Sequence, residues 1–296
     1  MKKKLVAEPA KRKQQRAKLK RVIAKAASLA CPTTPPNVGY MPSMLVLTTL
    51  PHRGSAKLLH RRANGNLTLE IVGHPEHGLP YGTYPRLILL YVCQQVVRTK
   101  SRVVEMGPGL TMAMKRCGLA VTGGTKGTIV AFRRQLDSLF YASVGWTWRS
   151  ERRITEEERS LIFRGRDTWT ESEFGEPAGC RITVDPRFLE ELGEHPVPID
   201  LSVVQHLAAT HGPFAIDLYT WLPYRLSRLE RPTEVSWEDL REQFGADYAS
   251  TKDFRRFFLE ALKAIRPHYP AARVEQYRGG LRLWPSASTI APKLGG

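Results

Sequence analysis

The sequence predicts an α+β fold in which one order of elements occurs twice. In each half, a helix-like segment precedes a short β-prone stretch, a compact helix ended by glycine, and a longer basic amphipathic segment. Three landmarks repeat at nearly one spacing: Gly82 and Gly212 are 130 residues apart, Gly118 and Gly245 are 127 apart, and Thr125 and Thr251 are 126 apart. Helix, strand, helix, turn and basic helix is the order of a winged helix-turn-helix unit. We therefore expect tandem winged-helix domains.

Composition narrows the class of protein. A chain of 296 residues with 42% hydrophobic residues is long enough for about two domains. Its net charge of +17 favours a polyanionic partner, either nucleic acid or an acidic membrane surface. The four cysteines form no C-x-x-C pair, which argues against a disulfide framework and against a zinc knuckle. Lysines interrupt any apolar signal-peptide core near the start, so we expect a cytoplasmic protein and no membrane partner.

The charge is concentrated at the N-terminus. Residues 1–26 hold 8 Lys and 3 Arg against the single acid Glu8, and have too few apolar residues for a core. We expect a disordered or conditionally helical arm that follows phosphates; a solubilising tail without a specific role is the alternative. The expected organisation is a basic arm with a Pro-rich linker (1–43), a first winged-helix domain with an N-terminal hairpin and a long wing insert (44–193), a second winged-helix domain (194–286) and a flexible tail (287–296).

In the first unit, β-prone stretches 44–50 and 67–72, separated by the turn signal Asn64-Gly65, predict a hairpin or cover strand. A core-packing helix is expected at 82–100, a strand at 102–106, and a small helix capped by Thr111. In the next helix, apolar positions from Ile129 to Phe140 share one face; Arg134 lies opposite, beside Ala131 and Ser138. Residues 144–149 should pair with 181–184 as a wing, with 155–177 as a long loop containing one short helix.

The second unit has stronger local signals. A buried helix is expected at 213–229, and Ser236 with Asp239 approximates a capping box for a helix at 237–244. In the helix 251–266, one face is apolar and the opposite face carries Lys252, Arg256 and Lys263. Residues 274–277 and 281–284 should form a two-stranded wing, with arginine at its tip.

Basic side chains on these elements are the candidate DNA contacts. In such units the last helix enters the major groove, where Arg or Lys can donate to guanine, and the wing reaches a flanking backbone or minor groove. Arg255 and Arg256 are the candidates for base readout, and four residues are expected to contact phosphate: Lys252, Lys263, Arg278 and Arg282. The remaining candidate DNA-binding residues are Lys126, Thr128, Arg133, Arg134 and Thr251. For any one of them, a solvated helix face is the alternative.

Catalytic patterns in the sequence are weak. His74-Pro75-Glu76-His77 has a metal-like spacing, but Pro75 prevents a continuous helix, so we interpret it as a surface turn. His206 and His211 weakly match the histidine segment of tyrosine recombinases, without the expected arginine or a clear tyrosine nucleophile. Glu156, Glu157 and Glu158 are interpreted as a solvated charge run. No nucleotide-binding loop occurs. We therefore expect no enzyme, no cofactor and no metal.

Several motifs between residues 44 and 285 resemble the RepA-type replication initiators of bacterial plasmids. The motifs are Leu50-Pro51-His52-Arg53, Gly78-Leu79-Pro80-Tyr81-Gly82-Thr83-Tyr84-Pro85-Arg86-Leu87, Val97-Arg98-Thr99-Lys100-Ser101-Arg102 and Thr122-Gly123-Gly124. The resemblance implies tandem winged helices that bind directly repeated origin sequences (iterons). It also implies association with the nucleoid or a plasmid, origin opening, recruitment of the host initiator DnaA and the replicative helicase, and repression of the initiator's own promoter as a dimer. A winged-helix transcriptional regulator and, further off, a recombinase or nuclease are the other candidates. We expect the second unit to dominate sequence reading.

Overall fold

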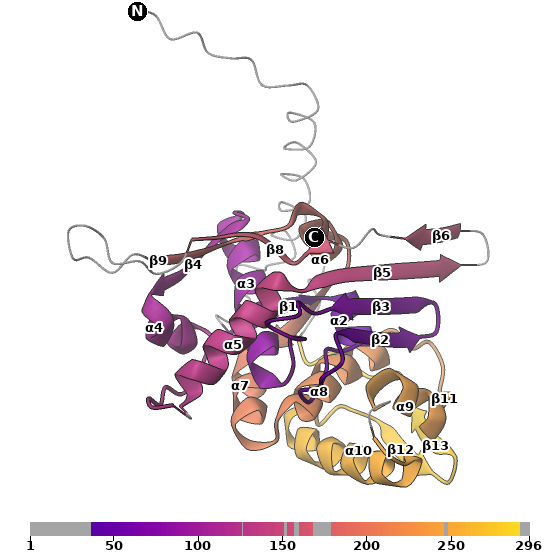
Figure 1. Cartoon of the computed structure of the whole chain (residues 1–296). Coiled ribbons are helices and arrows are strands. Elements are labelled where there is room, and N and C mark those ends of the chain that lie inside the picture. Colours follow the sequence, from indigo (N-terminus) through magenta and orange to yellow (C-terminus); the bar gives the residue numbers. More distant parts are fainter. Residues whose placement is uncertain are drawn as a thin grey trace, which may run out of the picture.

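The computed structural model describes residues 37–125, 127–150, 153–156, 160–167, 179–245 and 248–290, and they form a mixed α+β fold (Figure 1). The predicted basic arm lies outside these ranges. Two groups of elements follow one order. The first unit comprises α3 (Thr83–Thr99), β4 (Val103–Pro108), α4 (Gly109–Arg116), α5 (Thr128–Tyr141), β8 (Phe163–Asp167) and β9 (Gly179–Val184). The second unit comprises α8 (Pro213–Leu226), β11 (Thr233–Ser236), α9 (Trp237–Phe244), α10 (Thr251–Ile265), β12 (Val274–Tyr277) and β13 (Gly280–Leu283).

The sheets of the two units have the same strand order. In the first unit β9 lies between β4 and β8, and in the second unit β13 lies between β11 and β12. Every neighbouring pair is antiparallel. In both units the last strand is therefore central, with the strand that precedes the small helix on one side and the strand that follows the long helix on the other. The element order inferred from the repeated landmarks thus extends to the sheets.

The long first helices of the two units also begin alike. Gly82 and Gly212 are the N-cap residues of α3 and α8, with φ of 78° and 81°. This left-handed region is open to glycine, because glycine has no Cβ to collide with the backbone. The 130-residue spacing of these glycines is therefore a spacing of equivalent helix starts, as the sequence predicts.

A further sheet differs from the predicted wing. Strand β5 (Ser143–Ser150) pairs with β3 (Leu67–Val72), and not with β9. The sheet continues to β2 (Leu59–Asn64), β6 (Arg153–Glu156) and β7 (Ser160–Leu161). A hairpin does form at the turn signal Asn64-Gly65, but the strand that pairs with β3 is β2 and not the predicted stretch 44–50. The predicted pairing of 144–149 with 181–184 is wrong. The alternation of apolar residues predicts a strand, but it is compatible with any apolar antiparallel neighbour and does not select one. Here that neighbour carries Leu67, Leu69 and Ile71, all fully buried.

The segment 155–177 also differs from prediction. Apart from Ile162, its described parts lie in strands, and β8 pairs with β9 where 144–149 is predicted to do so. No short helix occurs in those parts, and residues 157–159 and 168–178 lie outside the described ranges. Thr111 does not cap α4 but lies within it, after the N-cap Pro108. The helix α5 begins at Thr128, so Thr125 belongs to the preceding turn.

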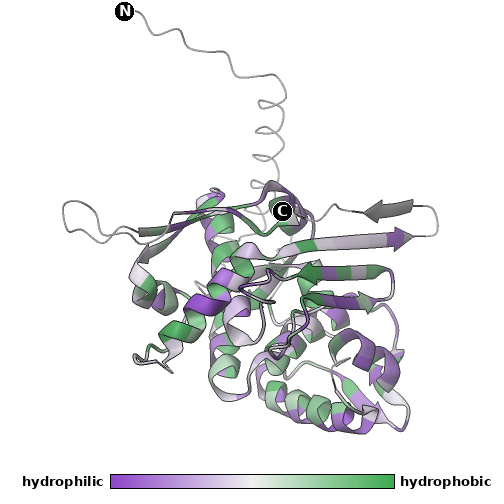
Figure 2. Ribbon diagram, viewed as in Figure 1, coloured by the Kyte–Doolittle hydropathy of each residue, from purple (hydrophilic) through white to green (hydrophobic). Residues whose placement is uncertain are grey.

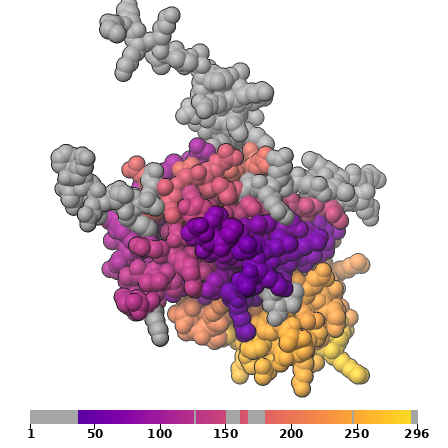
Figure 3. Space-filling view, in the orientation of Figure 1, coloured from indigo at the N-terminus to yellow at the C-terminus, as the bar shows by residue number. Residues whose placement is uncertain are grey.

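Residues 38–50 lie between the two units. The end of the predicted linker is the buried strand β1 (Val38–Pro42), which pairs with β10 (Pro196–Asp200). Residues 44–50 were predicted to be β-prone, but Ser43–Leu47 form the short helix α2, which contacts α8. A short buried apolar run cannot be assigned to helix or strand by periodicity alone. Figure 3 shows the N-terminal segment (indigo) between the first unit (magenta) and the second unit (yellow).

The remaining elements complete the core. Two helices precede the second unit: α6 (Pro186–Glu194) and α7 (Leu201–Thr210); the short turn η1 (Arg266–His268) follows α10. Hydrophobic residues follow the inward faces of the helices, with polar residues outside (Figure 2). At the C-terminal end, Tyr269 donates to the carbonyl of Ala287 over 2.7 Å, so the predicted flexible tail is anchored at its first residue. Among the described residues, every helix is too short or too polar to span a bilayer.

A buried ion pair joins the two units. Arg86 on α3 donates from Nε and Nη2 to the two carboxylate oxygens of Asp217 on α8, over 2.7 and 2.5 Å. The ring of His52 lies 2.8 Å from the same carboxylate. Burial lowers the pKa of His52, so the neutral ring donates its Nε2 proton. Burial would raise the pKa of Asp217, but the charge of Arg86 and the hydrogen bonds from Arg86 and His52 outweigh it and keep that pKa low. We call these three residues the interunit clamp.

Candidate nucleic-acid interface

Helix α10 presents the strongest basic face of the second unit. Ser250 caps it by accepting from the backbone N–H of Asp253. Five apolar residues are buried against the rest of the unit, as predicted: Phe254, Phe258, Ala261, Leu262 and Ile265. On the opposite side Lys252, Arg256 and Lys263 are exposed. The helix therefore separates its apolar and basic residues into two faces.

The basic side chains of α10 differ in their partners. Lys252 and Lys263 make no ion pair with another described residue. Arg256 lies 3.8 Å from Asp253, an exposed contact that contributes little. Arg255 is half-buried, with its guanidinium 5.4 Å from the ring of Trp237. This packing restricts Arg255 to the edge of the basic face, while the other three side chains project from it.

The β12–β13 hairpin is confirmed, with Arg278 exposed in the turn. Arg282 lies opposite Glu234 on β11 and donates to its carboxylate from Nε and Nη2, over 3.0 and 2.7 Å. Both side chains are about half exposed. Arg282 is thus already paired, whereas Arg278 extends the positive surface beyond α10. Thr251 is the first residue of α10 and is half-buried.

Helix α5 of the first unit is more enclosed. Arg134 donates to the hydroxyl of Tyr81 over 2.6 Å and lies over its ring. Asp137 pairs with Arg166 from β8, whose guanidinium also packs on Phe140. These contacts occupy part of the face that the sequence leaves open for a ligand. The contribution of Arg166 could not be found from sequence, because β8 had no predicted role.

Other predicted residues of α5 are also accounted for. The hydroxyl of Thr128 donates to the carbonyl of Ala120 and accepts from the backbone N–H of Thr122, so it closes the turn before the helix. Ser138 was placed beside Arg134 on the outer face, but it is fully buried because the His77 segment covers it; its hydroxyl donates to the His77 carbonyl over 2.5 Å. Lys126 lies outside the described residues. Arg133 is exposed and has no ion pair with the described residues.

A groove of about 360 Å³ runs between α5, the Tyr81–Tyr84 segment and α7. Arg134, Gln135 and Gln205 line it. The end of α4 lies close to α7 here: a Cβ added at Gly118 would lie 2.2 Å from the amide nitrogen of Gln205. Sequence reasoning missed Gln205, because α7 was not predicted. Part of the resemblance motif, Tyr81 to Tyr84, therefore supports α5 and is not free on the surface.

The structure places the two histidine patterns of the sequence in different settings, one at α7 and one in a turn. At the C-cap of α7, the ring of His211 contacts the hydroxyl of Thr210 over 2.7 Å. His206, within α7, lies with its ring 5.3 Å from that of His268. Glu157 and Glu158 lie outside the described residues. His74, Glu76 and His77 form a turn, as interpreted, but their ligand atoms all lie within 4.8 Å of one another. Proline prevents a helix at this position, yet the turn brings both imidazoles together.

Comparison with known proteins identifies the family. A family model described as plasmid encoded RepA protein matches residues 79–239, more than half of the chain. The chain belongs to this family. The match includes the whole first unit and ends within α9, before α10 and the β12–β13 hairpin.

Comparison with solved structures gives a more distant similarity. A crystal structure of selenomethionine derivatives of domain 2 and domain 3 of RctB has a TM-score of 0.49 and 12% sequence identity. The similarity covers 82% of this chain and 97% of that chain. No curated protein matches the sequence.

Proposed function

We propose that this chain is a plasmid replication initiator that binds repeated origin DNA through two winged-helix units. One observation carries the proposal: each unit combines the same strand order in its sheet with a long helix next to it that exposes basic residues. Membership of the plasmid encoded RepA family supports the replication role. The net charge of +17 supports binding to a polyanion.

The two units have different tasks in this proposal. Helix α10 lies in the major groove, with Arg256 and the edge residue Arg255 directed to base edges. Lys252 and Lys263 contact phosphates on either side, and Arg278 in the β12–β13 turn reaches the flanking backbone. In the first unit Arg133 and Arg134 contact the backbone. On one monomer the two long helices meet the same side of the duplex roughly 10.5 bp apart, about one helical turn.

The partners of this function follow from the family. Bound at repeated sites, the initiator promotes opening of the origin and recruits host DnaA and the replicative helicase; as a dimer it represses its own promoter. The chain itself acts by binding and carries out no catalysis, so it needs no cofactor. The basic arm, residues 1–26, adds affinity without sequence preference.

Footprinting on the DNA that flanks the gene tests the proposal. We expect protection of direct repeats beside an A·T-rich tract, and strand opening in that tract at high occupancy. Protection of one isolated palindrome without strand opening would favour a transcriptional regulator and contradict initiation. A covalent protein–DNA adduct or metal-dependent nicking would contradict the non-enzymatic part.

A pair of double variants tests the binding surface. Arg255→Ala with Arg256→Ala should reduce the ratio of specific to random DNA affinity. Lys57→Ala with Arg61→Ala removes the same charge from exposed positions at the N-terminal hairpin and is the control. Fluorescence anisotropy on both DNAs measures the ratio. If the ratio of specific to random DNA affinity falls equally in the two double variants, α10 does not read sequence.

A further inference from the structure

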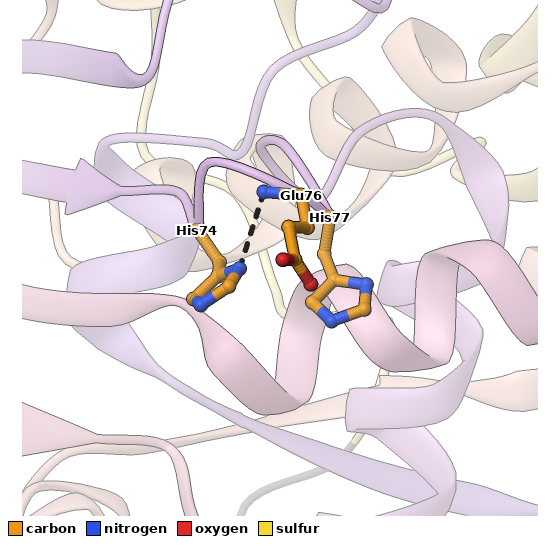
Figure 4. Close-up of side chains that lie close together, drawn as sticks. All are labelled: His74, Glu76 and His77. Atoms are coloured by element: carbon orange, nitrogen blue, oxygen red, sulfur yellow. Dashed lines mark hydrogen bonds between the residues drawn. The ribbon is translucent and has the colours of Figure 1, made fainter.

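We propose that His74, Glu76 and His77 form a binding site for a divalent transition-metal ion of the zinc type. The three residues lie in the turn between β3 and α3, and their ligand atoms are within 4.8 Å of one another (Figure 4). The site is independent of the proposed DNA function. Two imidazoles and one carboxylate form a donor set that suits Zn²⁺, Ni²⁺ or Cu²⁺ better than Mg²⁺ or Ca²⁺.

The turn backbone is fixed before any ion binds. The N–H groups of His77 and Gly78 both donate to the carbonyl of His74, over 3.2 and 2.7 Å. His74 and Gly78 also form a β-bridge, and Ser138 from α5 donates to the carbonyl of His77. A Cβ at Gly73 would lie 2.6 Å from the backbone of Gly78, so only glycine permits this approach without a shift. The two histidines are therefore adjacent at no further cost in backbone entropy.

The rings are positioned by Tyr141 at the end of α5. The ring of His77 stacks on Tyr141 with centroids 4.4 Å apart and planes 8° apart. His74 lies 5.3 Å from the same tyrosine and 5.0 Å from His77. Both histidines are half-buried, whereas Glu76 is exposed and can rotate. The carboxylate is thus the adjustable ligand between two rings that are already held.

The distances permit coordination after a small adjustment. With bonds of about 2.0–2.2 Å to zinc, ligand atoms in a tetrahedral site lie about 3.4 Å apart. Contraction from the 4.8 Å limit needs a rotation of Glu76 and a small shift of the imidazoles, because the limit applies to the two histidines as well. The Nδ1 lone pair of His74 accepts a 3.2 Å hydrogen bond from the backbone N–H of Glu76. This bond is long and weak, so a cation can replace it at that nitrogen. Water would complete the coordination.

Zinc binding by the tag-free full chain tests the site. Zn²⁺ is titrated in competition with a chromophoric chelator, with Mg²⁺ in excess as a check on selectivity. We expect one equivalent bound by the wild type. His74→Phe and His77→Phe should each weaken affinity by at least about tenfold, because loss of even an outer-shell partner costs that much. Phenylalanine keeps an aromatic ring against Tyr141, so folding is preserved, and circular dichroism checks it.

The control variant removes the other close histidine pair. His206→Ala breaks the contact between His206 and His268, and should leave zinc affinity unchanged. Glu76→Gln should weaken binding without altering the turn. The proposal is overturned if the wild type binds no zinc, if both phenylalanine variants bind like the wild type, or if only His206→Ala loses binding.

Discussion

Replacing Arg86 by alanine should destabilise the protein by about 3–5 kcal/mol, the cost of leaving one member of a buried ion pair alone. The Arg86 side chain is 3% exposed and that of Asp217 is 8% exposed. The guanidinium makes five hydrogen bonds: two to the Asp217 carboxylate and one each to the carbonyls of Leu50, Pro51 and Gly82. No other cation among the described residues contacts that carboxylate, since burial keeps His52 neutral.

The magnitude follows from what remains after the change. In Arg86→Ala, the buried Asp217 carboxylate keeps only the hydrogen bond from His52. Three backbone carbonyls lose their bond from Arg86, although that of Pro51 still accepts from the N–H of Gly82. An unpaired buried polar group costs about 1–3 kcal/mol, so carbonyls that water does not reach add to the loss. Asp217→Ala leaves the opposite charge unpaired and should cost a similar amount. The double variant should recover much of the loss, because neither charge is then buried alone.

Urea unfolding followed by circular dichroism and tryptophan fluorescence measures these effects. Arg282→Ala is the control, because it breaks an arginine–carboxylate pair that also has two hydrogen bonds but whose side chains are about half exposed. It should cost no more than about 1 kcal/mol. If Arg86→Ala lowers the free energy of unfolding as little as Arg282→Ala does, the interunit clamp does not hold the units together. The same follows if the loss in the double variant equals the sum of the losses in the two single variants.

Four other predictions concern single residues. Because burial holds the pKa of His52 below its ordinary 6.5, the unfolded chain takes up a proton at higher pH than the folded chain. The contribution of His52 to the free energy of unfolding in urea should be fully present above pH 6.5 and should fall as the pH is lowered through that value. In His52→Gln the free energy of unfolding should depend less on pH. Gly212→Ala forces a side chain into φ of 81° and should cost about 1–2 kcal/mol in thermal melts, whereas Gly123→Ala, which has open space, should not. Ser236→Ala removes the cap of α9 and should cost about 1 kcal/mol by urea unfolding. Lys263→Ala should reduce the slope of log affinity against log salt on any DNA by about 1, measured by anisotropy.

The second unit could be predicted because its signals are local. Ser236 and Asp239 form the predicted capping box in both directions. The spacing of apolar residues in α10 correctly predicts each of its buried residues. The glycine-containing turn correctly predicts the β12–β13 hairpin. Each of these features depends on contacts within a few residues along the chain. Sequence patterns describe such contacts directly.

The strand pairing of the first unit could not be predicted because the paired strands are distant in sequence. Strand β5 joins β3, about 75 residues earlier, while β8 replaces it beside β9. The alternation of Val144, Trp146 and Trp148 predicts a strand, but it does not predict which strand lies beside it. The same limit applies to the short helix α2, whose apolar residues would also suit a buried strand.

The resemblance motifs gain a physical role that spacing alone does not supply. Arg86 and His52 belong to two of them, and both contact Asp217, more than 130 residues further along the chain. An arginine in an amphipathic pattern is normally assigned to the surface, because arginine is rarely buried unless it is paired. The pairing partner was invisible from sequence. Two residues of the resemblance motifs therefore fix the two units relative to each other.

The same reasoning sharpens the expected difference between the two basic helices. A helical wheel shows Arg134 as the centre of an open face, but the fold uses it to hold Tyr81. Arg166 covers Asp137 on the same helix. Arg133 and Arg134 are both exposed, but of the two only Arg133 has no side-chain partner among the described residues, since Arg134 is held by Tyr81. In α10 no element covers Lys252, Arg256 or Lys263, and all three are exposed. A cation already bound within the protein must break that contact to meet a base, whereas a solvated one need not. Sequence discrimination should therefore depend on α10 more than on α5. The first unit should mainly position the protein on the DNA.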